Sequence, residues 1–141
     1  MFESICVPAV LYGCEAWLVN NVLRKKINVF EMNGLRSICN ISRRERVRNV
    51  RIREMCNRNK SLANRVDRGV LKWFGHVNRM NDERLVKKVF DSEVVGRRGR
   101  GRPRWRWMDG VEDVLKGKGL TVEEGLMIVN DRSEWRRLVH G

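Results

Sequence analysis

The sequence has little of what metal sites, sheets and membrane spans require. Its four cysteines form no Cys-x-x-Cys pair and only two histidines accompany them, which argues against zinc-finger spacing and favours free, partly buried thiols. With two prolines and no sustained alternation of apolar and polar residues, no sheet is indicated. The longest apolar run, Ile5–Cys14, is too short to cross a bilayer and has no basic segment before it. We therefore expect an intracellular protein with no membrane span, signal peptide, metal or cofactor.

Acidic residues are also scarce, since 17 Asp and Glu stand against 30 Lys and Arg, for a net charge of +13. Such a balance predicts a polyanion as partner, RNA or DNA above all, and not a small-molecule substrate. The charge lies in two blocks: residues 22–60 hold 12 basic against 3 acidic residues, and residues 97–107 hold six arginines and no acid. Residues 108–141 hold 5 basic and 7 acidic residues, a net charge of −2, which predicts no binding of a charged partner.

Apolar residues at helical spacing dominate the chain. From Leu23 to about Asn40 they predict an amphipathic helix that packs one face and presents a cationic one. Ser42 has the side chain of an N-cap for a second basic helix that continues to Lys60. Ser61 precedes the clearest helix, in which the apolar residues follow at steps of four, four, three, four and three: Leu62, Val66, Val70, Trp73, Val77 and Met80.

Shorter helices are predicted on either side. The apolar block Ile5–Trp17 fits a short buried helix, or a strand and turn around Gly13, and its pattern does not separate the two. The other predicted helices run from Asn81 and Asp82 through Leu85 and Val89, from Met108 to Leu115 with a stop at Gly117, from a capping box of Thr121 and Glu124 through Met127, and from one of Asp131 and Glu134 through Val139. We therefore predict an all-α fold, a small bundle of about five to seven short helices with an extended Arg/Gly-rich loop.

The basic tract Gly96–Arg104 holds four glycine or proline residues among its arginines, which predicts an extended, mobile loop. Six arginines in and beside it are candidates for neutralising phosphates: Arg97, Arg98, Arg100, Arg102, Arg104 and Arg106. The alternative is a solvated tail or a nuclear-import signal. Residues 100–103 read RGRP, similar to the AT-hook core, in which an extended segment inserts arginines into a narrow minor groove.

Other basic and aromatic residues have two interpretations each. The cations on the predicted basic helices either follow a nucleic-acid backbone or form a solvated face: Arg24, Lys25, Lys26, Arg43, Arg44 and Arg46. Trp105 and Trp107 share a face and can stack on bases if the backbone is extended, whereas on a helix at least one belongs to the core. We expect His76 to be a hydrogen-bonded structural residue, and Trp17, Trp73 and Trp135 to be core residues.

Four sequence blocks occur in a characteristic order: VLYGCEAW (Val10–Trp17), LKWFGHVNRM (Leu71–Met80), GRRGRGRPRWRWMDGVED (Gly96–Asp113) and NDRSEWRRLV (Asn130–Val139). Their order and spacing resemble the C-terminal end of reverse transcriptases from non-LTR, LINE-type retrotransposons, where such blocks follow the polymerase palm. The resemblance implies a thumb-like helical region with basic helices over residues 1–95, a mobile basic loop over 96–107 and short C-terminal helices over 108–141.

The polymerase chemistry of that family needs carboxylates that hold two divalent cations around the incoming phosphate. This chain has no adjacent aspartates and no endonuclease-like cluster of His, Asp and Glu. The resemblance therefore implies a non-catalytic, nuclear fragment of a reverse transcriptase, which binds the backbone of RNA or DNA through basic helices and the Arg-rich loop. The alternatives are an independent DNA-binding protein that uses an RGRP arm, and a non-functional translated transposon remnant.

Overall fold

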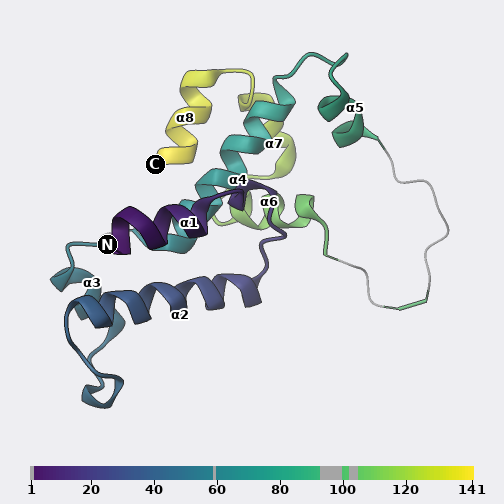
Figure 1. Cartoon of the computed structure of the whole chain (residues 1–141). Coiled ribbons are helices and arrows are strands. Elements are labelled where there is room, and N and C mark those ends of the chain that lie inside the picture. The colour runs from purple at the N-terminus through teal and green to yellow at the C-terminus, as the bar shows by residue number, and fades with distance from the viewer. Residues whose placement is uncertain (1, 59, 93–99, 102–104) are drawn as a thin grey trace. The chain divides into compact units, whose positions relative to one another are not determined.

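The computed structural model describes residues 2–58, 60–92, 100–101 and 105–141. These residues form eight α-helices and no strand, which confirms the all-α fold and slightly exceeds the predicted number of helices (Figure 1). None of the described helices combines the length and the apolar character that a bilayer crossing requires. The chain forms two compact units: the first comprises Met1–Cys14 and Val19–Asp67, and the second comprises Glu15–Leu18 and Arg68–Gly141.

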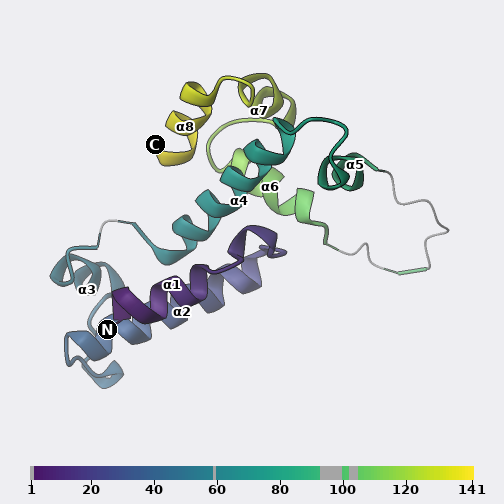
Figure 2. The same cartoon turned by 45° about the horizontal axis from the view of Figure 1, so that its top comes forward.

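The N-terminal apolar block is helical and not a strand. A π-helical turn, Phe2–Cys6, leads into α1 (Val7–Leu11), and Gly13 makes the following turn at a φ of 66°, a conformation that glycine adopts at little cost. In the first unit, α1 runs alongside α2 (Asn21–Ile38) in both views (Figures 1 and 2). The Phe2 ring lies 5.8 Å from that of Phe30, centroid to centroid.

Helix α2 confirms the amphipathic helix predicted from Leu23, and it begins two residues earlier because Asn20 caps it. The Asn20 side chain accepts a hydrogen bond from the Leu23 N–H at 2.9 Å. The apolar spacing that predicted this helix included Ile27 and Leu35, which are buried, and Phe30 and Ile38, which are 38% and 58% exposed. Glu31 and Met32 are the other buried residues of α2.

The single basic helix predicted from Ser42 to Lys60 is wrong. Ser42 does begin a helical turn, and its backbone N–H donates to the Glu45 carboxylate at 2.6 Å, but the 3-10 turn Arg43–Glu45 ends at once. Arg46 then takes a left-handed φ of 54°, which a continuing helix cannot contain. Helix α3 (Asn49–Met55) follows and packs Ile52 against Met32 and Leu35 of α2.

Helix α4 (Leu62–Asn78) confirms the clearest sequence prediction. The Ser61 hydroxyl accepts a hydrogen bond from the Asn64 N–H at 3.3 Å, as expected of an N-cap. Four stripe residues are buried: Leu62, Val66, Val70 and Val77. Trp73 and Met80 are only half-buried, and Phe74 takes the fully buried position beside Trp73.

The second unit continues with α5 (Leu85–Asp91), α6 (Trp107–Lys116), α7 (Val122–Ile128) and α8 (Arg132–His140). Helices α7 and α8 begin where they were predicted, α7 with the full capping box of Thr121 and Glu124 and α8 with Asp131 as its N-cap. The Thr121 hydroxyl accepts from the Glu124 N–H at 3.2 Å, and the Asp131 carboxylate accepts from the backbone of Ser133 and Glu134. Gly117 closes α6 as predicted.

An aromatic cluster forms the core of the second unit. The Phe74 ring centroid lies 6.4 Å from those of Phe90 and Trp107 and 5.8 Å from that of Trp135. Trp135 is buried as predicted, and its indole N–H donates to the Leu71 carbonyl at 3.2 Å. Any Cβ on residue 75 would collide with this indole, so Gly75 permits the close approach. Of the other tryptophans expected in the core, Trp17 is only half-buried, like Trp73.

Candidate nucleic-acid interface

The predicted basic loop lies mostly outside the described residues, including Arg97, Arg98, Arg102 and Arg104. Two of its candidate arginines, Arg100 and Arg106, are described, and both are exposed. The Arg106 backbone N–H donates to the Asp109 carboxylate at 2.7 Å at the start of α6. Arg106 therefore stands at a defined helix end with its side chain in solvent.

Trp107 packs within the second unit. Its ring is half-buried, lies 5.9 Å from the Phe90 centroid, and its indole N–H donates to the Glu15 carbonyl at 2.8 Å. This supports the core alternative for Trp107, and base stacking by the Trp105–Trp107 pair stays a prediction. His76 is exposed, and its ring lies 5.5 Å from that of Trp73.

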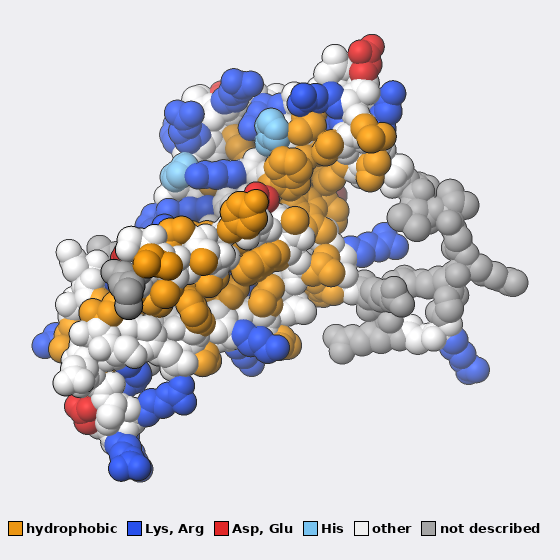
Figure 3. All heavy atoms as spheres, viewed as in Figure 1, with side chains coloured by type: hydrophobic (Ala, Val, Ile, Leu, Met, Phe, Trp, Pro, Cys, Tyr) orange, Lys and Arg blue, Asp and Glu red, His pale blue; other side chains and the backbone are white. Residues whose placement is uncertain are grey.

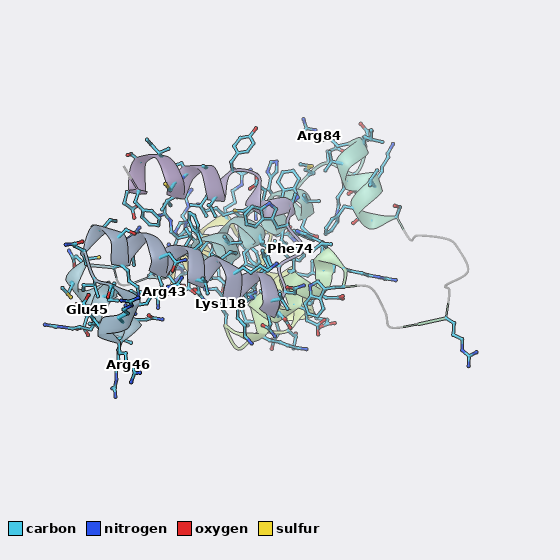
Figure 4. The ribbon with its side chains drawn as sticks, turned by 60° about the horizontal axis from the view of Figure 1, so that its bottom comes forward. Arg43, Glu45, Arg46, Phe74, Arg84 and Lys118 are labelled. Carbon is cyan, nitrogen blue, oxygen red and sulfur yellow. The ribbon has the colours of Figure 1, made fainter. Side chains whose placement is uncertain are left out.

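In the first unit, the turn after α2 brings together the candidates Arg43, Arg44 and Arg46, all of them exposed. Figure 4 labels Arg43 and Arg46 in this turn, and Arg46 projects away from the ribbon. The Arg43 guanidinium donates to the Asn33 side chain at 2.5 Å, which fixes its position. A groove of about 400 Å³ adjoins the turn, with these lining residues: Asn33, Arg36, Ser37, Asn40, Ile41, Ser42 and Arg43.

Arg36 supplies a further cation to this groove that the sequence did not single out. One of its terminal nitrogens donates to the Val47 carbonyl at 2.6 Å and to Asn49 at 3.2 Å. The other, Nη1, is buried and has no hydrogen-bond partner among the described residues. Because an unsatisfied buried donor is costly, an anion or water in this groove would stabilise it.

The candidates at the start of α2 divide into two kinds. The Arg24 guanidinium donates to both carboxylate oxygens of Asp67, at 2.6 and 2.5 Å, so its charge is already paired. Lys25 and Lys26 are exposed to solvent. The structure therefore assigns Arg24 a structural contact and leaves the two lysines as candidate phosphate contacts.

The second unit has an open groove of about 670 Å³ that was not predicted from the sequence, here called the α4–α8 groove. Its lining residues are Lys72, His76, Arg79, Met80, Asn81, Arg84, Arg132, Trp135, Arg136, Val139 and His140. Five of them are Lys or Arg, two are His, and none of the described lining residues is acidic. Figure 3 shows both histidines of the chain, in pale blue, among blue Lys and Arg side chains.

Helical spacing gathers these cations. Lys72 and His76 are four apart on α4, Arg79 follows directly after the end of this helix, and the cations Arg132 and Arg136 are four apart on α8. The Arg79 guanidinium donates to the Val129 carbonyl at 2.7 Å, and its burial, followed by the nearby charge of Arg132, lowers its pKa. The second cause shows that Arg79 and Arg132 lie close enough for their positive charges to repel each other.

The helical spacing of these residues could have predicted the groove from the sequence. The net charge of the segment gave no indication of it. Residues 108–141 carry a net charge of −2, yet acids and bases occupy different positions on the helices. The Asp131 carboxylate, for example, accepts three hydrogen bonds within the first turn of α8. A helical-wheel projection of α8 would have placed Arg132 and Arg136 together on one face of the helix.

The cysteines supply no ligand set for a metal. None of the four forms a disulfide, and the sulfurs of Cys39 and Cys56 lie 3.0 Å apart, within hydrogen-bond distance. Burial, and then the Cys39 thiol, raise the pKa of Cys56 to about 11, which disfavours the thiolate that metals bind. Within the described part of the chain, no three His, Cys, Asp or Glu side chains converge on a metal position.

The chain is similar to a transposon-derived protein. That protein, an uncharacterised one from Caenorhabditis elegans, shares 27% identity over 146 residues, which cover 99% of this chain and 52% of the relative. The chain thus spans about half the length of this curated relative. Neither a protein-family profile nor a solved structure matches the chain.

Proposed function

We propose that the chain is a transposon-derived, non-catalytic module that binds the sugar-phosphate backbone of RNA or DNA. In this proposal it corresponds to the thumb and C-terminal region of a non-LTR retrotransposon reverse transcriptase. Two observations support the origin: the similarity to a transposon-derived protein over nearly the whole chain, and the four ordered blocks in the sequence. Identity of 27% over half of the relative supports the lineage more than any particular activity.

The observation that carries the binding proposal is the grouping of cations on described surfaces, where they outnumber the acids. In the first unit, the turn with Arg43, Arg44 and Arg46 adjoins a groove that Arg36 also lines. In the second unit, the α4–α8 groove is lined by five Lys or Arg residues. Cations gathered in this way release the counterions condensed on a nucleic acid, which gives affinity with little sequence preference.

A salt titration tests the binding. The affinity of the full chain would be measured against salt concentration for single-stranded RNA, mixed-sequence duplex DNA and AT-rich duplex DNA. If about six phosphates are contacted, the plot of log K against log salt has a slope near −5 on duplex DNA and near −4 on a single strand. A flat response on all three would overturn the proposed function.

The same titration separates the RGRP alternative. An independent DNA-binding protein with an AT-hook-like arm would prefer the AT-rich duplex, because arginines enter its narrow minor groove. Arg102→Ala should then abolish the preference while leaving much of the salt dependence. Equal affinity for both duplexes supports backbone binding instead.

The proposed module has no polymerase chemistry and is nuclear. We expect no extension of a primer when the full chain is incubated with a primer–template, deoxynucleotides and Mg²⁺ or Mn²⁺, since it lacks paired carboxylates to hold two cations. Any metal-dependent extension would refute the non-catalytic assignment. Fluorescence microscopy of a tagged chain tests the location, and exclusion from the nucleus would contradict it.

A further inference from the structure

We propose that the α4–α8 groove is a binding site for the phosphodiester backbone of a nucleic-acid strand. The inference rests on the proposed function and deepens it, because it places a contact in the second unit, in a segment whose net charge gives no hint of one. None of the predicted candidate residues lies in this groove. The ligand class follows from the charge, the spacing and the rigidity of its lining.

The charge of the groove is free to meet an external anion. Lys72, Arg132 and Arg136 are exposed and make no side-chain hydrogen bond or ion pair with any described residue. Arg84, labelled in Figure 4 at the turn before α5, is in the same situation. Elsewhere in the second unit, by contrast, Lys87 pairs with Asp91 at 3.0 Å and Lys116 with Glu112 at 2.7 Å. Among the described residues, Lys88 and Arg137 are also unpaired but do not line the groove, whereas four unpaired cations line it together: Lys72, Arg84, Arg132 and Arg136.

The spacing of the cations fits a strand better than a compact ion. Lys72 on α4 and Arg79, one residue beyond the end of this helix, are seven residues apart, which is about 10.5 Å at a rise of about 1.5 Å per residue. Phosphates on one strand of a duplex are spaced by about 3.4 Å along the axis, so these two cations can contact phosphates that are about three positions apart. Arg132 and Arg136 supply a second row, one helical turn apart, from α8. Two rows of cations along an open groove suit a linear polyanion.

The lining of the groove is held by fixed groups. Trp135 and Val139, on the same helix as the two arginines, are buried, and the Trp135 indole is anchored on the Leu71 carbonyl. The bond from Arg79 to the Val129 carbonyl fixes a third cation. Because the helices that carry the cations are ordered before binding, little conformational entropy is lost when a strand enters.

The test compares two double variants of the full chain that remove the same charge from exposed positions of the second unit. Arg132→Gln/Arg136→Gln removes two cations from the groove, and Lys88→Gln/Arg137→Gln removes two that do not line it. On single-stranded RNA, losing two phosphate contacts should reduce the magnitude of the salt slope by about 1.4, which is about 25-fold in affinity at 0.1 M salt. The control pair should leave the slope near that of wild type, with helical content by circular dichroism unchanged in both.

A single substitution guards against misfolding of the double variant. Lys72→Gln lies on α4, away from the helix that carries both arginines, and should weaken binding about five-fold at 0.1 M salt through one lost contact. Two results would overturn the groove site and leave the proposed function standing. In one, both double variants weaken binding equally; in the other, Lys72→Gln leaves binding unchanged. Absence of salt-dependent binding in the wild type would instead overturn the function itself.

A phosphate-bearing lipid headgroup carries similar chemistry, and a parallel measurement separates it. Vesicles of phosphatidylcholine with phosphoinositide would be sedimented with the wild-type chain and the groove variant. We expect no difference between the two proteins in this assay. Vesicle binding that Arg132→Gln/Arg136→Gln abolishes, together with unchanged RNA binding, would reassign the groove to a membrane surface.

Discussion

At the scale of single residues, Glu31 shows how one buried charge connects three helices of the first unit. Its side chain is 1% exposed, and its carboxylate accepts hydrogen bonds from Arg53 of α3 at 2.8 Å and from the Leu62 N–H at 2.9 Å. The Leu62 N–H is one of the unsatisfied donors at the start of α4, where the helix dipole also favours a negative charge. A position that a hydrophobic stripe would assign to the core thus holds a carboxylate that caps another helix.

We predict that Glu31→Ala lowers the free energy of unfolding by about 2 to 4 kcal/mol, because it leaves the partly buried Arg53 and the Leu62 N–H without their acceptor. Glu31→Gln keeps an acceptor oxygen and should lose less than half as much. Urea denaturation followed by circular dichroism measures both. Losses of equal size in the two variants would show that packing, and not hydrogen bonding, determines the effect.

Cys56 gives a residue-scale prediction on pH. Burial is the main cause that raises its pKa from an ordinary value of 9.0 to about 11. The folded chain therefore retains the proton that the unfolded chain loses first, so the stability from this group is complete below pH 9 and is lost as the pH rises through 11. We expect unfolding free energy to fall over this range, and Cys56→Ala to remove part of the fall. An identical pH profile in Cys56→Ala would assign the decline to other groups.

At the scale of elements, sequence predicted helices where the signal is local. Ser61, Thr121 and Asp131 each accept a hydrogen bond from a backbone N–H three residues later, and a helix begins at each of them. The choice of buried face was less predictable. The stripe on α4 included Trp73, whereas Phe74 is the buried aromatic, because it faces Phe90, Trp107 and Trp135. Those partners lie 16 to 61 positions away, and periodicity within one helix holds no information about them.

The four blocks that carry the family resemblance meet in the packing of the second unit. Gly75 of the second block accommodates Trp135 of the fourth, and Trp107 of the third donates to the Glu15 carbonyl of the first. Gly75, Trp107 and Trp135 of these blocks therefore serve the fold. Recognition of such blocks predicts an architecture, and the binding surface has to be found separately from charge and exposure.

The turn after α2 gives a prediction in which stability and binding move in opposite directions. Arg46 holds a left-handed φ of 54°, which costs a residue with a Cβ about 1 kcal/mol more than glycine. Arg46→Gly should raise the free energy of unfolding by about 0.5 to 1 kcal/mol and weaken binding to duplex DNA about eight-fold at 0.1 M salt, through one lost phosphate contact. Denaturation and a salt titration on the same sample measure both changes.

Arg44→Gly is the matched control for this turn. It removes the same charge from the same exposed segment, but Arg44 lies inside the 3-10 turn, where glycine is unfavourable. This variant should weaken binding similarly and lower stability. If Arg46→Gly also destabilises the chain, the left-handed backbone at residue 46 is not a source of strain.

At the scale of the whole molecule, the net charge indicates a polyanionic partner but points to only part of the proposed binding surface. The turn with Arg43 and Arg46 stood out because few acids lie near it in sequence. The α4–α8 groove did not stand out in the sequence, because its residues Lys72 and Arg136 are 64 positions apart. Arg136 also belongs to a segment with a net charge of −2. A count along the chain averages charges that helices sort onto separate faces.

Whether the two surfaces act together on one nucleic acid can be decided by combining their variants. The substitutions are Arg43→Gln/Arg44→Gln/Arg46→Gln in the first unit and Arg132→Gln/Arg136→Gln in the second. If one strand contacts both surfaces at once, the losses in log K add. On single-stranded RNA the magnitude of the salt slope should then decrease by about 2.1 in the triple variant, by about 1.4 in the double variant and by about 3.5 in the variant with all five substitutions.

Separate binding of short strands at the two surfaces would give a different pattern. The stronger surface would then dominate the measured affinity, substitutions in the weaker one would change it little, and the combined variant would lose more than the two separate losses together. Measurement of the stoichiometry with RNA of increasing length distinguishes the cases independently, because simultaneous contact requires a minimum length of strand and yields a single bound strand per chain. We expect additive losses and a stoichiometry of one, since a +13 chain with two basic surfaces neutralises most charge by sharing one polyanion.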